Sequence, residues 1–364
     1  MLPATERLLL GPGPSPVSAR VMRAMGAPVL SHLDPDLMAI LDDIRARLLS
    51  TFRAADGSLA FAISGTGTSG MEAAVGNIVR PGARSTVVVT GYFGDRLVQM
   101  LERYGASVSR VDVEWGRACD PARLEAALAQ NGADVVAMVH AETSTGVLNP
   151  VDDLCAVASR HGAMTIVDAV TSLGAHPVDV AKWGADACYS CTQKGLGAPS
   201  GLAPIVFSER ARSVWLKPRS FYFDLALLED YWVRRKYHHT ISAPLVYALR
   251  EALVAVEEEG LDARWERHRC NHLALTAGLE QLGLRLLPPG PERLWSLNAV
   301  VVPDGVDEAL VRNRLLKEFN IEIGAGLGPL AGRIWRVGLM GSGSTIANLS
   351  LFLAALKTVL PRTV

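Results

Sequence analysis

TIVDAV at residues 165–170 and ACYSCTQKGLGAP at residues 187–199 are two apolar runs that each lead to one charged side chain. The first run predicts a buried strand that ends at Asp168, and the second predicts a strand that leads to Lys194 in a turn rich in glycine and proline. Strands that are apolar throughout are typical of a parallel sheet whose two faces are both covered. The carboxyl ends of such strands meet at one edge, so the acid and the lysine are expected to lie near each other.

The same alternation of short apolar runs and helical segments extends through the first two-thirds of the chain, which predicts an α/β fold with a mostly parallel sheet. Strands are expected at residues 60–63, 85–89, 108–111, 135–139, 165–167, 187–190 and 202–207, and helices at residues 70–78, 95–104, 121–129 and 152–161. Pro204 indicates that the last strand lies at a sheet edge or contains a bulge, because proline cannot donate to a ladder.

The C-terminal third follows a different pattern, which predicts a smaller α+β domain. Helices are expected at residues 244–283, with a break near Gly260, at residues 311–318 and at residues 345–360. Strands are expected at residues 297–302 and 334–337. At the other end of the chain, closely spaced glycines and prolines predict an extended arm that turns into a helix at residues 16–25. The expected parts are therefore an arm at residues 1–15, a large domain at residues 16–255 and a small domain at residues 256–364.

Composition and charge narrow the class of protein. The chain has 364 residues, of which 49% are hydrophobic and 20% charged, so it can bury the cores of two globular domains. A net charge of -1 without long charge runs argues against a nucleic-acid partner and favours a small-molecule one. Neither a signal peptide nor a membrane span is visible, and the cytoplasm is the expected location.

The cysteines and histidines do not predict a metal site. Cys188 and Cys191 form a CxxC pattern, but they fall on a predicted buried strand with no second pair, so core thiols are the better interpretation. His238 and His239 are adjacent and point apart on an extended chain, and no acidic residue stands near them in the sequence.

The acid and the lysine together match the requirements of pyridoxal phosphate. An acid can pair with the protonated ring nitrogen of this cofactor, and a lysine can form an imine with its aldehyde. The sequence ISGTGTSGME at residues 63–72 predicts a strand, a glycine- and hydroxyl-rich turn and a helix, and such a turn can hold a phosphate at the helix N-terminus. An ordinary strand-to-helix turn has a similar composition, so this segment alone does not decide between the two readings.

Three more segments add candidates at predicted strand ends. Phe93, between Gly91 and Asp95, can lie flat on a heterocycle or fill the core. Thr143 follows another strand and could hold the phenolic oxygen of the cofactor, although the segment also resembles an ordinary polar loop. Arg336 alternates with apolar residues and is either a surface charge or a clamp for a carboxylate. Their shared place at the carboxyl ends of strands, together with Thr66, Asp168 and Lys194, favours one ligand site.

Taken together, these residues resemble aminotransferase class V of the fold-type I pyridoxal-phosphate enzymes. Within that class the chain is most similar to the alanine–glyoxylate and serine–glyoxylate (serine–pyruvate) aminotransferase family. The resemblance spans nearly the whole chain, and the stretches that carry it are GPGP at 11–14, SHLDP at 31–35, ETSTGVL at 142–148, VDAVTSLG at 167–174, QK at 193–194 with APSG at 198–201, YHHT at 237–240 and EIGAGLG at 322–328. It implies transfer of the amino group of alanine or serine to glyoxylate, which yields glycine and pyruvate or hydroxypyruvate.

The resemblance also implies a role for individual residues. Lys194 and Asp168 are the catalytic pair, as imine lysine and partner of the ring nitrogen. In the cofactor site, Phe93 and Val170 would cover the two faces of the ring, and Thr143 would lie near the phenolic oxygen. The residues expected at the phosphate are Thr66, Gly67, Thr68 and Gln193. Tyr237 and Thr240 would reach the phosphate of the neighbouring subunit. Arg336 matches the grip on the substrate carboxylate, and Gly13 and Thr143 line the substrate side. A homodimer is implied, because each site is then completed by its neighbour.

Differences from the family pattern leave other functions open. Thr68 stands where some relatives have histidine, and SHLDP follows the microbial branch, whose members differ in amino donor. A class V transaminase for ureidoglycine or an aminophosphonate is therefore the main alternative. A cysteine desulfurase would need a mobile nucleophilic cysteine late in the chain, and Cys270 lies in a charged helix. A catalytically idle subunit is disfavoured, because the lysine and the acid are both present.

Overall fold

The computed structural model describes residues 6–361, and its largest element is a seven-stranded sheet. The strands follow the order β2 (Leu59–Gly65), β10 (Gly201–Phe207), β9 (Ala187–Tyr189), β8 (Met164–Asp168), β5 (Val135–Val139), β3 (Arg84–Val89) and β4 (Ser107–Asp112). Only β10 runs against its neighbours, and the other pairs are parallel. This architecture confirms the α/β class and each strand expected for the large domain.

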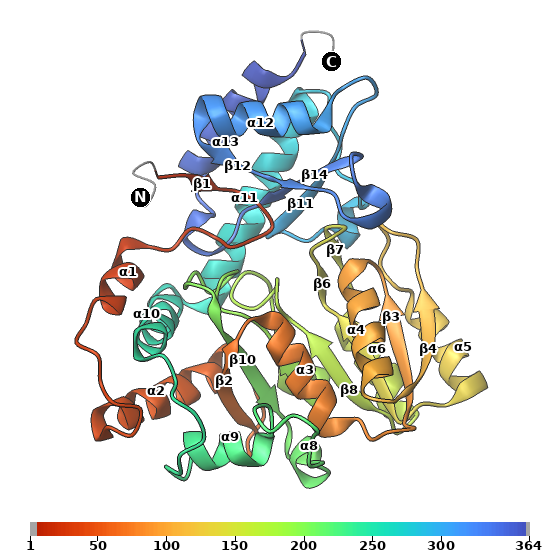
Figure 1. The fold of residues 1–364 in the computed structure, drawn as a ribbon. Coiled ribbons are helices and arrows are strands. Elements are labelled where there is room, and N and C mark those ends of the chain that lie inside the picture. Colours follow the sequence, from red (N-terminus) through yellow and green to blue (C-terminus); the bar gives the residue numbers. More distant parts are fainter. Residues whose placement is uncertain (1–5, 362–364) are drawn as a thin grey trace.

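Helices connect these strands and pack against the sheet (Figure 1). They are α1 (Ala19–Met25), α2 (Pro35–Thr51), α3 (Gly67–Ile78), α4 (Tyr92–Arg103), α5 (Pro121–Asn131), α6 (Val151–Arg160), α7 (Val180–Trp183), α8 (Glu209–Ser213), α9 (Leu225–Trp232) and α10 (Ala243–Glu259). In the part of the chain that the structure describes, no helix is long and apolar enough to cross a membrane.

Helix α2 is an element that the sequence pattern did not lead us to expect, although its signals are present. The side chain of Asp34 accepts a hydrogen bond from the N–H of Asp36, and Pro35 occupies the first turn, as is usual at a helix start. One face of the helix then carries a buried apolar stripe, formed by Leu37, Met38, Leu41, Ile44 and Leu48. This spacing matches the helical period, and it anchors α2 in the core of the large domain.

The prediction of an edge or a bulge at Pro204 is wrong. Strand β10 lies between β2 and β9, and its register with β2 runs without interruption from Gly201 to Phe207. The carbonyl of Pro204 accepts a hydrogen bond from the N–H of Ser190, just beyond the last residue of β9. The ladder with β9 ends at the pair of Tyr189 and Ile205, so the proline stands beside its end, where it accepts one hydrogen bond and lacks only the reciprocal one.

The C-terminal part forms a smaller α+β unit above the large sheet in Figure 1. Its elements are α11 (Leu261–Gln281), β11 (Leu297–Val301), α12 (Glu308–Phe319), β12 (Ile321–Glu322), β13 (Gly324–Ala325), β14 (Ile334–Gly338) and α13 (Ile346–Val359), with 3-10 turns at Gly290–Glu292, Gly328–Leu330 and Gly341–Gly343. Strands β11, β14 and β13 form one antiparallel sheet. A short hairpin of β6 (Ala141–Glu142) and β7 (Val147–Leu148) rises toward this unit from the large domain.

The first described residues of the N-terminal arm pack in the small unit, and the chain then continues into the large one. Strand β1 (Leu8–Leu9) pairs in parallel with β12, and Leu10 is buried in the small unit's core. That core is separate from the larger one around the sheet. The domain boundaries at residues 15/16 and 255/256 stay predictions, and residues 1–5 and 362–364 lie outside the described residues.

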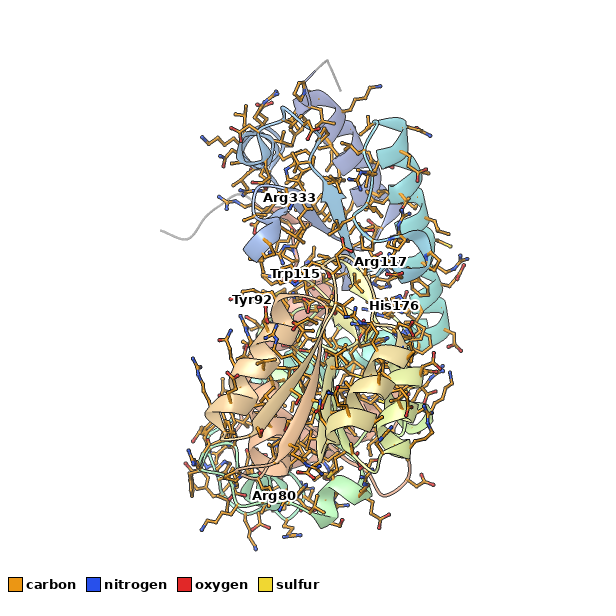
Figure 2. All side chains as sticks on the ribbon, turned by 90° about the vertical axis from the view of Figure 1, so that its right-hand side faces the viewer. Arg80, Tyr92, Trp115, Arg117, His176 and Arg333 are labelled. Atoms are coloured by element: carbon orange, nitrogen blue, oxygen red, sulfur yellow. The ribbon has the colours of Figure 1, made fainter. Side chains whose placement is uncertain are left out.

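Contacts between the two units lie at the carboxyl ends of the parallel strands. The hydroxyl of Ser296 donates to the carbonyl of Thr171 at 3.0 Å, just past the end of β8. Figure 2 shows Trp115 and Arg117 at this junction, whereas Arg80 lies at the opposite end of the sheet. Trp115 packs against the core formed by Ala299, Leu330 and Ile334 of the small unit. The junction therefore covers the sheet edge where Asp168 ends its strand.

Removing one side chain from the small core should destabilise the protein strongly. Phe352 on α13 is 1% exposed, so Phe352→Ala should lower the free energy of unfolding by about 3–5 kcal/mol through lost burial and a cavity. The neighbouring Leu351 is 48% exposed, and Leu351→Ala should change it by less than about 0.5 kcal/mol. Urea denaturation followed by circular dichroism measures both, and equal losses in the two variants would contradict the assignment of this core.

Candidate active site

A cavity of about 330 Å³ lies at the carboxyl ends of the central strands. Sequence-predicted residues that line it are Gly13, Thr66, Gly67, Thr68, Phe93, Thr143, Asp168, Val170, Gln193 and Lys194. Pro14 of the arm also lines it, together with residues that were not predicted, namely Met71, Arg96, Val139, Ala141 and Ser200. The structure thus brings residues from the arm, from several strand ends and from two helix starts to one place, while the role of each one stays a prediction.

Asp168 is the last residue of β8 and is buried, with 3% of its surface exposed. Its Oδ1 accepts the N–H of Val170 at 2.8 Å, and its Oδ2 accepts the hydroxyl of Tyr189 at 2.9 Å. Burial raises the pKa of this carboxyl to about 7, and the nearby charge of Glu142 acts in the same direction. The two hydrogen bonds and Lys194 oppose that shift without cancelling it. A cation placed beside Asp168 would therefore restore its charged form.

Lys194 lies in the turn after β9, and the arm closes over it. The hydroxyl of Ser15 donates to the carbonyl of Lys194 at 2.8 Å, and the Lys194 ammonium donates to the carbonyl of Pro12. Gly13 has a φ of +110°, and a Cβ added there would lie 2.6 Å from Nζ of the lysine, so glycine is required at this close approach. Burial lowers the pKa of Lys194, and the positive charge of Arg336 lowers it further. A lowered pKa suits an amine that has to act as nucleophile and base.

The N-terminus of α3 provides a cradle for an anion on one side of the cavity. Thr66 precedes the helix without capping it through its side chain, so the first N–H groups remain available. A Cβ added at Gly67 would lie 2.7 Å from Cγ2 of Val170, which explains the small residue there. The amide oxygen of Gln193 is buried and has no hydrogen-bond partner in the described chain. The free N–H groups fit a bound anion at this end, and the amide oxygen of Gln193 leaves room for a donor beside it.

Arg96 is a site residue that sequence reasoning missed. It lies one helical turn after Phe93 on α4, and its guanidinium stands 5.0 Å from the centroid of that ring. Its Nη1 donates to the hydroxyl of Thr68 at 3.0 Å. The neighbouring acid, Asp95, pairs with Arg110 instead. A cation thus faces the same cradle, and the signal that could have revealed it was the i, i+3 spacing from Phe93.

Glu142 is a second missed residue, and it fixes the wall of the cavity that carries Phe93 and Thr143. Its fully buried carboxylate accepts the N–H groups of Phe93 and Gly94, each at 3.2 Å, at the start of α4. It also accepts the N–H and the hydroxyl of Ser144, at 3.1 and 2.6 Å. Burial raises the pKa of Glu142, and these four donors oppose the shift. One acid therefore joins the helix of the aromatic ring to the loop of Thr143, whose hydroxyl bonds that of Thr171.

Arg336 and the YHHT segment lie outside the cavity wall of the single chain. Nε of Arg336 donates to the carbonyl of Ala325 at 2.6 Å, and its Nη1 reaches the carbonyl of Thr143 at 3.4 Å. Burial lowers the pKa of Arg336 to about 10, so it remains cationic at neutral pH. Tyr237 is 61% exposed, and Thr240 is exposed as well. The structure does not bring these two residues to the cavity of their own chain.

The residues present fit a flat, cationic heteroaromatic ring with an anionic tail. Asp168 is a buried carboxylate that a ring cation would satisfy, and the α3 cradle with Arg96 would receive the anion. Among residues 6–361 no cluster of histidine, cysteine and acidic side chains has the arrangement of a metal site. Cys188 and Cys191 are buried free thiols, and burial raises the pKa of Cys191 to about 12, which suits packing rather than reactivity.

Comparisons with known proteins agree with this geometry. The aminotransferase class-V family model matches residues 11–334. The chain is 38% identical to (S)-ureidoglycine–glyoxylate transaminase of Bacillus subtilis over 98% of this chain and 91% of that protein. It is 36% identical to alanine–glyoxylate aminotransferase of Drosophila melanogaster over 97% of this chain and 92% of that protein. A solved alanine–glyoxylate aminotransferase from Nostoc sp. is 43% identical with a TM-score of 0.97, covering 99% of this chain and 97% of the other.

Replacing Asp168 by asparagine should change how the stability of the cofactor-free protein depends on pH. The folded-state pKa of about 7 lies above the ordinary value of 3.8, so the folded state binds the proton more tightly. Stability that comes from this proton is present below the ordinary pKa and is lost as the pH rises through the folded one. At pH 8, Asp168→Asn should therefore be more stable than the unaltered protein by an amount on the order of 4 kcal/mol, and the difference should vanish near pH 4. Thermal melting of both proteins between pH 4 and 8 measures this, and a constant difference would contradict the raised pKa.

Proposed function

The chain belongs to the class-V aminotransferases, and from this premise we propose that it transfers the amino group of alanine or serine to glyoxylate with the help of pyridoxal phosphate. The products are glycine and pyruvate or hydroxypyruvate. The observation that carries the proposal is the convergence of Lys194 and Asp168 on one cavity whose small size suits short substrates. The names of the relatives from Drosophila melanogaster and Nostoc sp. support the same reaction.

The cavity residues that the sequence predicted would hold the cofactor. Asp168 would pair with the ring nitrogen, Phe93 and Val170 would cover the two ring faces, and Thr143 would face the phenolic oxygen. The phosphate would lie at Thr66, Gly67, Thr68 and Gln193, with the charge of Arg96 beside it. When bound, pyridoxal phosphate supplies an electron sink that acidifies the α-proton of an attached amino acid.

Residues of the chain would transfer the proton, bind the substrate and exclude water. Lys194 has a pKa lowered by burial, so its amine can take the α-proton of the donor and later return a proton. Arg336 would grip the substrate carboxylate in a bidentate manner and so fix the direction of the Cα–H bond. The arm around Gly13 and Pro14 would exclude water from the lysine and line the entrance. The second half of the reaction reverses these proton movements on glyoxylate.

The amino donor has one serious alternative. The Bacillus subtilis relative is named for ureidoglycine, and its 38% identity is close to that of the alanine–glyoxylate relatives. An enzyme for ureidoglycine or an aminophosphonate would keep the cofactor residues and differ around the arm and Arg336. A cysteine desulfurase is disfavoured, because the hydrogen bond of Cys270 to Glu266 raises the pKa of this thiol, the only late cysteine, when a nucleophile needs it lowered. We place the enzyme in the cytoplasm.

Stopped-flow absorbance should rank the donors directly. The enzyme loaded with pyridoxal phosphate is mixed with L-alanine, L-serine or (S)-ureidoglycine, without a keto acid. Alanine or serine should quickly remove the visible absorbance of the bound cofactor, and glyoxylate should restore it. Response to ureidoglycine alone would transfer the function to the alternative, and a protein that takes up no pyridoxal phosphate would contradict the proposal as a whole. Lys194→Ala serves as the control, because it should not respond to any donor.

The exposed Tyr237 and Thr240 lead us to propose that a homodimer completes the site, each subunit reaching the phosphate of its neighbour. A mixture of Lys194→Ala and Tyr237→Ala subunits tests this. Either variant alone should have little activity, whereas a hybrid dimer has one site with both residues. After subunit exchange, about one quarter of the unaltered activity should return. If Tyr237 acted within its own chain, mixing would restore none.

A further inference from the structure

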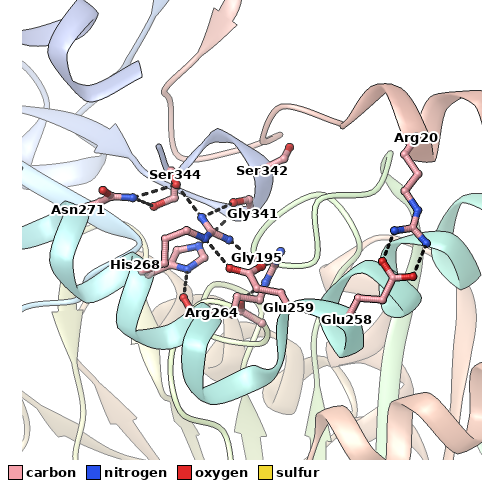
Figure 3. Close-up of polar contacts among 12 residues, drawn as sticks. Arg20, Gly195, Glu258, Glu259, Arg264, His268, Asn271, Gly341, Ser342 and Ser344 are labelled. Carbon is pink, nitrogen blue, oxygen red and sulfur yellow. Dashed lines mark hydrogen bonds and ion pairs between the residues drawn. The ribbon is translucent and has the colours of Figure 1, made fainter. Parts of the chain in front are cut away.

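A buried arginine, Arg264, joins two loops of the candidate site from behind. It lies in the first turn of α11 and is 5% exposed. Its Nε donates to the carbonyl of Gly174 at 2.8 Å, and its Nη2 donates to the carbonyl of Gly195 at 2.8 Å. Its remaining nitrogen, Nη1, pairs with Glu259, the last residue of α10. Figure 3 shows this guanidinium between the turn of Gly195 and the end of α10.

The two loops that Arg264 joins follow the two central residues of the site. Gly174 ends the turn that begins after Asp168, and Gly195 follows Lys194 directly. A Cβ at Gly195 would lie 2.3 Å from the carbonyl oxygen of Leu173, and the loops therefore touch backbone to backbone. The hydrogen bonds of one planar guanidinium hold the carbonyls of both loops in register. The relative position of the lysine and the acid depends on this contact.

The same network continues into the small unit. Glu259 also pairs with Arg267, whose Nη1 donates to the carbonyls of Gly341 and Ser344 at 3.1 and 2.6 Å. These residues belong to the loop that follows β14, the strand of Arg336. A Cβ at Gly341 would lie 3.3 Å from the carbonyl oxygen of Lys194, so this loop rests on the lysine turn (Figure 3). The turn is thus enclosed between Arg264 and the small unit.

We propose that Arg264 is a positioning residue that sets the geometry of proton transfer by Lys194. The inference rests on the proposed function, because it assumes that the amine of Lys194 accepts the α-proton of the amino donor. Transfer between a carbon and an amine requires the two atoms at contact distance and in line, and a displacement of about 1 Å can cost on the order of 100-fold in rate. Arg264 does not line the cavity, and it acts on the site through the backbone carbonyls of Gly174 and Gly195.

Lysine is not an adequate substitute at this position. Its single ammonium cannot hold the planar, two-carbonyl geometry that a guanidinium provides, although it retains the positive charge beside Glu259. Arg264→Lys keeps the positive charge and loses the two-carbonyl geometry, whereas Arg264→Met loses both. The two variants together therefore separate the effect of the charge from that of the geometry. The half-exposed Arg210 offers a control with the same two kinds of contact: its Nη2 donates to the carbonyl of Gly162, before β8, at 2.8 Å, and its Nη1 pairs with Asp186, before β9, at 3.5 Å. None of these residues lines the cavity.

The test compares deuterium isotope effects and hydrogen exchange in these variants. With alanine deuterated at its α-carbon, both Arg264 variants should show a larger isotope effect on kcat, while kcat falls by about 10- to 100-fold and KM changes little. In the cofactor-free protein, the backbone amides of residues 192–200 should exchange faster in the Arg264 variants. Arg210→Met should lower the melting temperature without changing the isotope effect or the exchange of this segment.

The outcomes distinguish this proposal from the function on which it rests. An isotope effect is independent of the fraction of folded enzyme, so a purely structural role of Arg264 would leave it unchanged and overturn the proposal. An unchanged exchange rate at residues 192–200 would also overturn it, whatever the activity. Absence of transamination in the unaltered enzyme would instead refute the proposed function, and the hydrogen exchange result would still report whether Arg264 holds the turn.

Discussion

The structure depends on a carboxylate that is buried at the end of a strand, where the charge of Lys194 does not offset the effect of burial. Asp168 is held by one backbone N–H and one tyrosine hydroxyl, and burial raises its pKa to about 7. Taking an ionised carboxylate out of water without a partner is costly, and the group relieves the cost by binding a proton. A ligand with a cationic ring removes that need, so the fold is prepared for one kind of occupant before any occupant is present.

The surrounding architecture explains how so many separate segments converge on that carboxylate. The parallel strands end at one edge, and the segments that follow β2, β3, β5, β8 and β9 all contribute residues to the cavity. The small unit and the arm then cover this edge, because β1 pairs with β12 while Ser15 bonds the turn of Lys194. The arm therefore links the small unit directly to the turn of Lys194.

Much of the fold and of the cavity could be predicted from the sequence, because both rest on local patterns. The strands are continuous apolar runs, and the lysine, acid and glycine-rich turn follow them at short range. Residues that act across the fold could not be found in this way: Glu142 binds the start of α4, some fifty positions away, and Arg264 bonds Gly174 across a separation of 90. Pro204 misled for a related reason, because the sequence does not show that the ladder between β9 and β10 ends at Ile205, the residue next to the proline. Helix α2, by contrast, carried a readable cap and stripe.

The buried charged residues of the site also indicate that ligand binding is linked to the protonation of these residues. Burial shifts the pKa of Asp168 and Glu142 upward and that of Lys194 and Arg336 downward, so each of the four groups is moved toward its neutral form. A ring cation would favour the charged form of Asp168, and a substrate carboxylate would pair with the guanidinium of Arg336, which is already charged at neutral pH. Because the charge of Arg336 lowers the pKa of Lys194, a carboxylate that neutralises it would raise the basicity of the lysine. On the roles proposed for Arg336 and Lys194, the substrate would therefore strengthen the base that removes its own α-proton, and a molecule without a carboxylate would not.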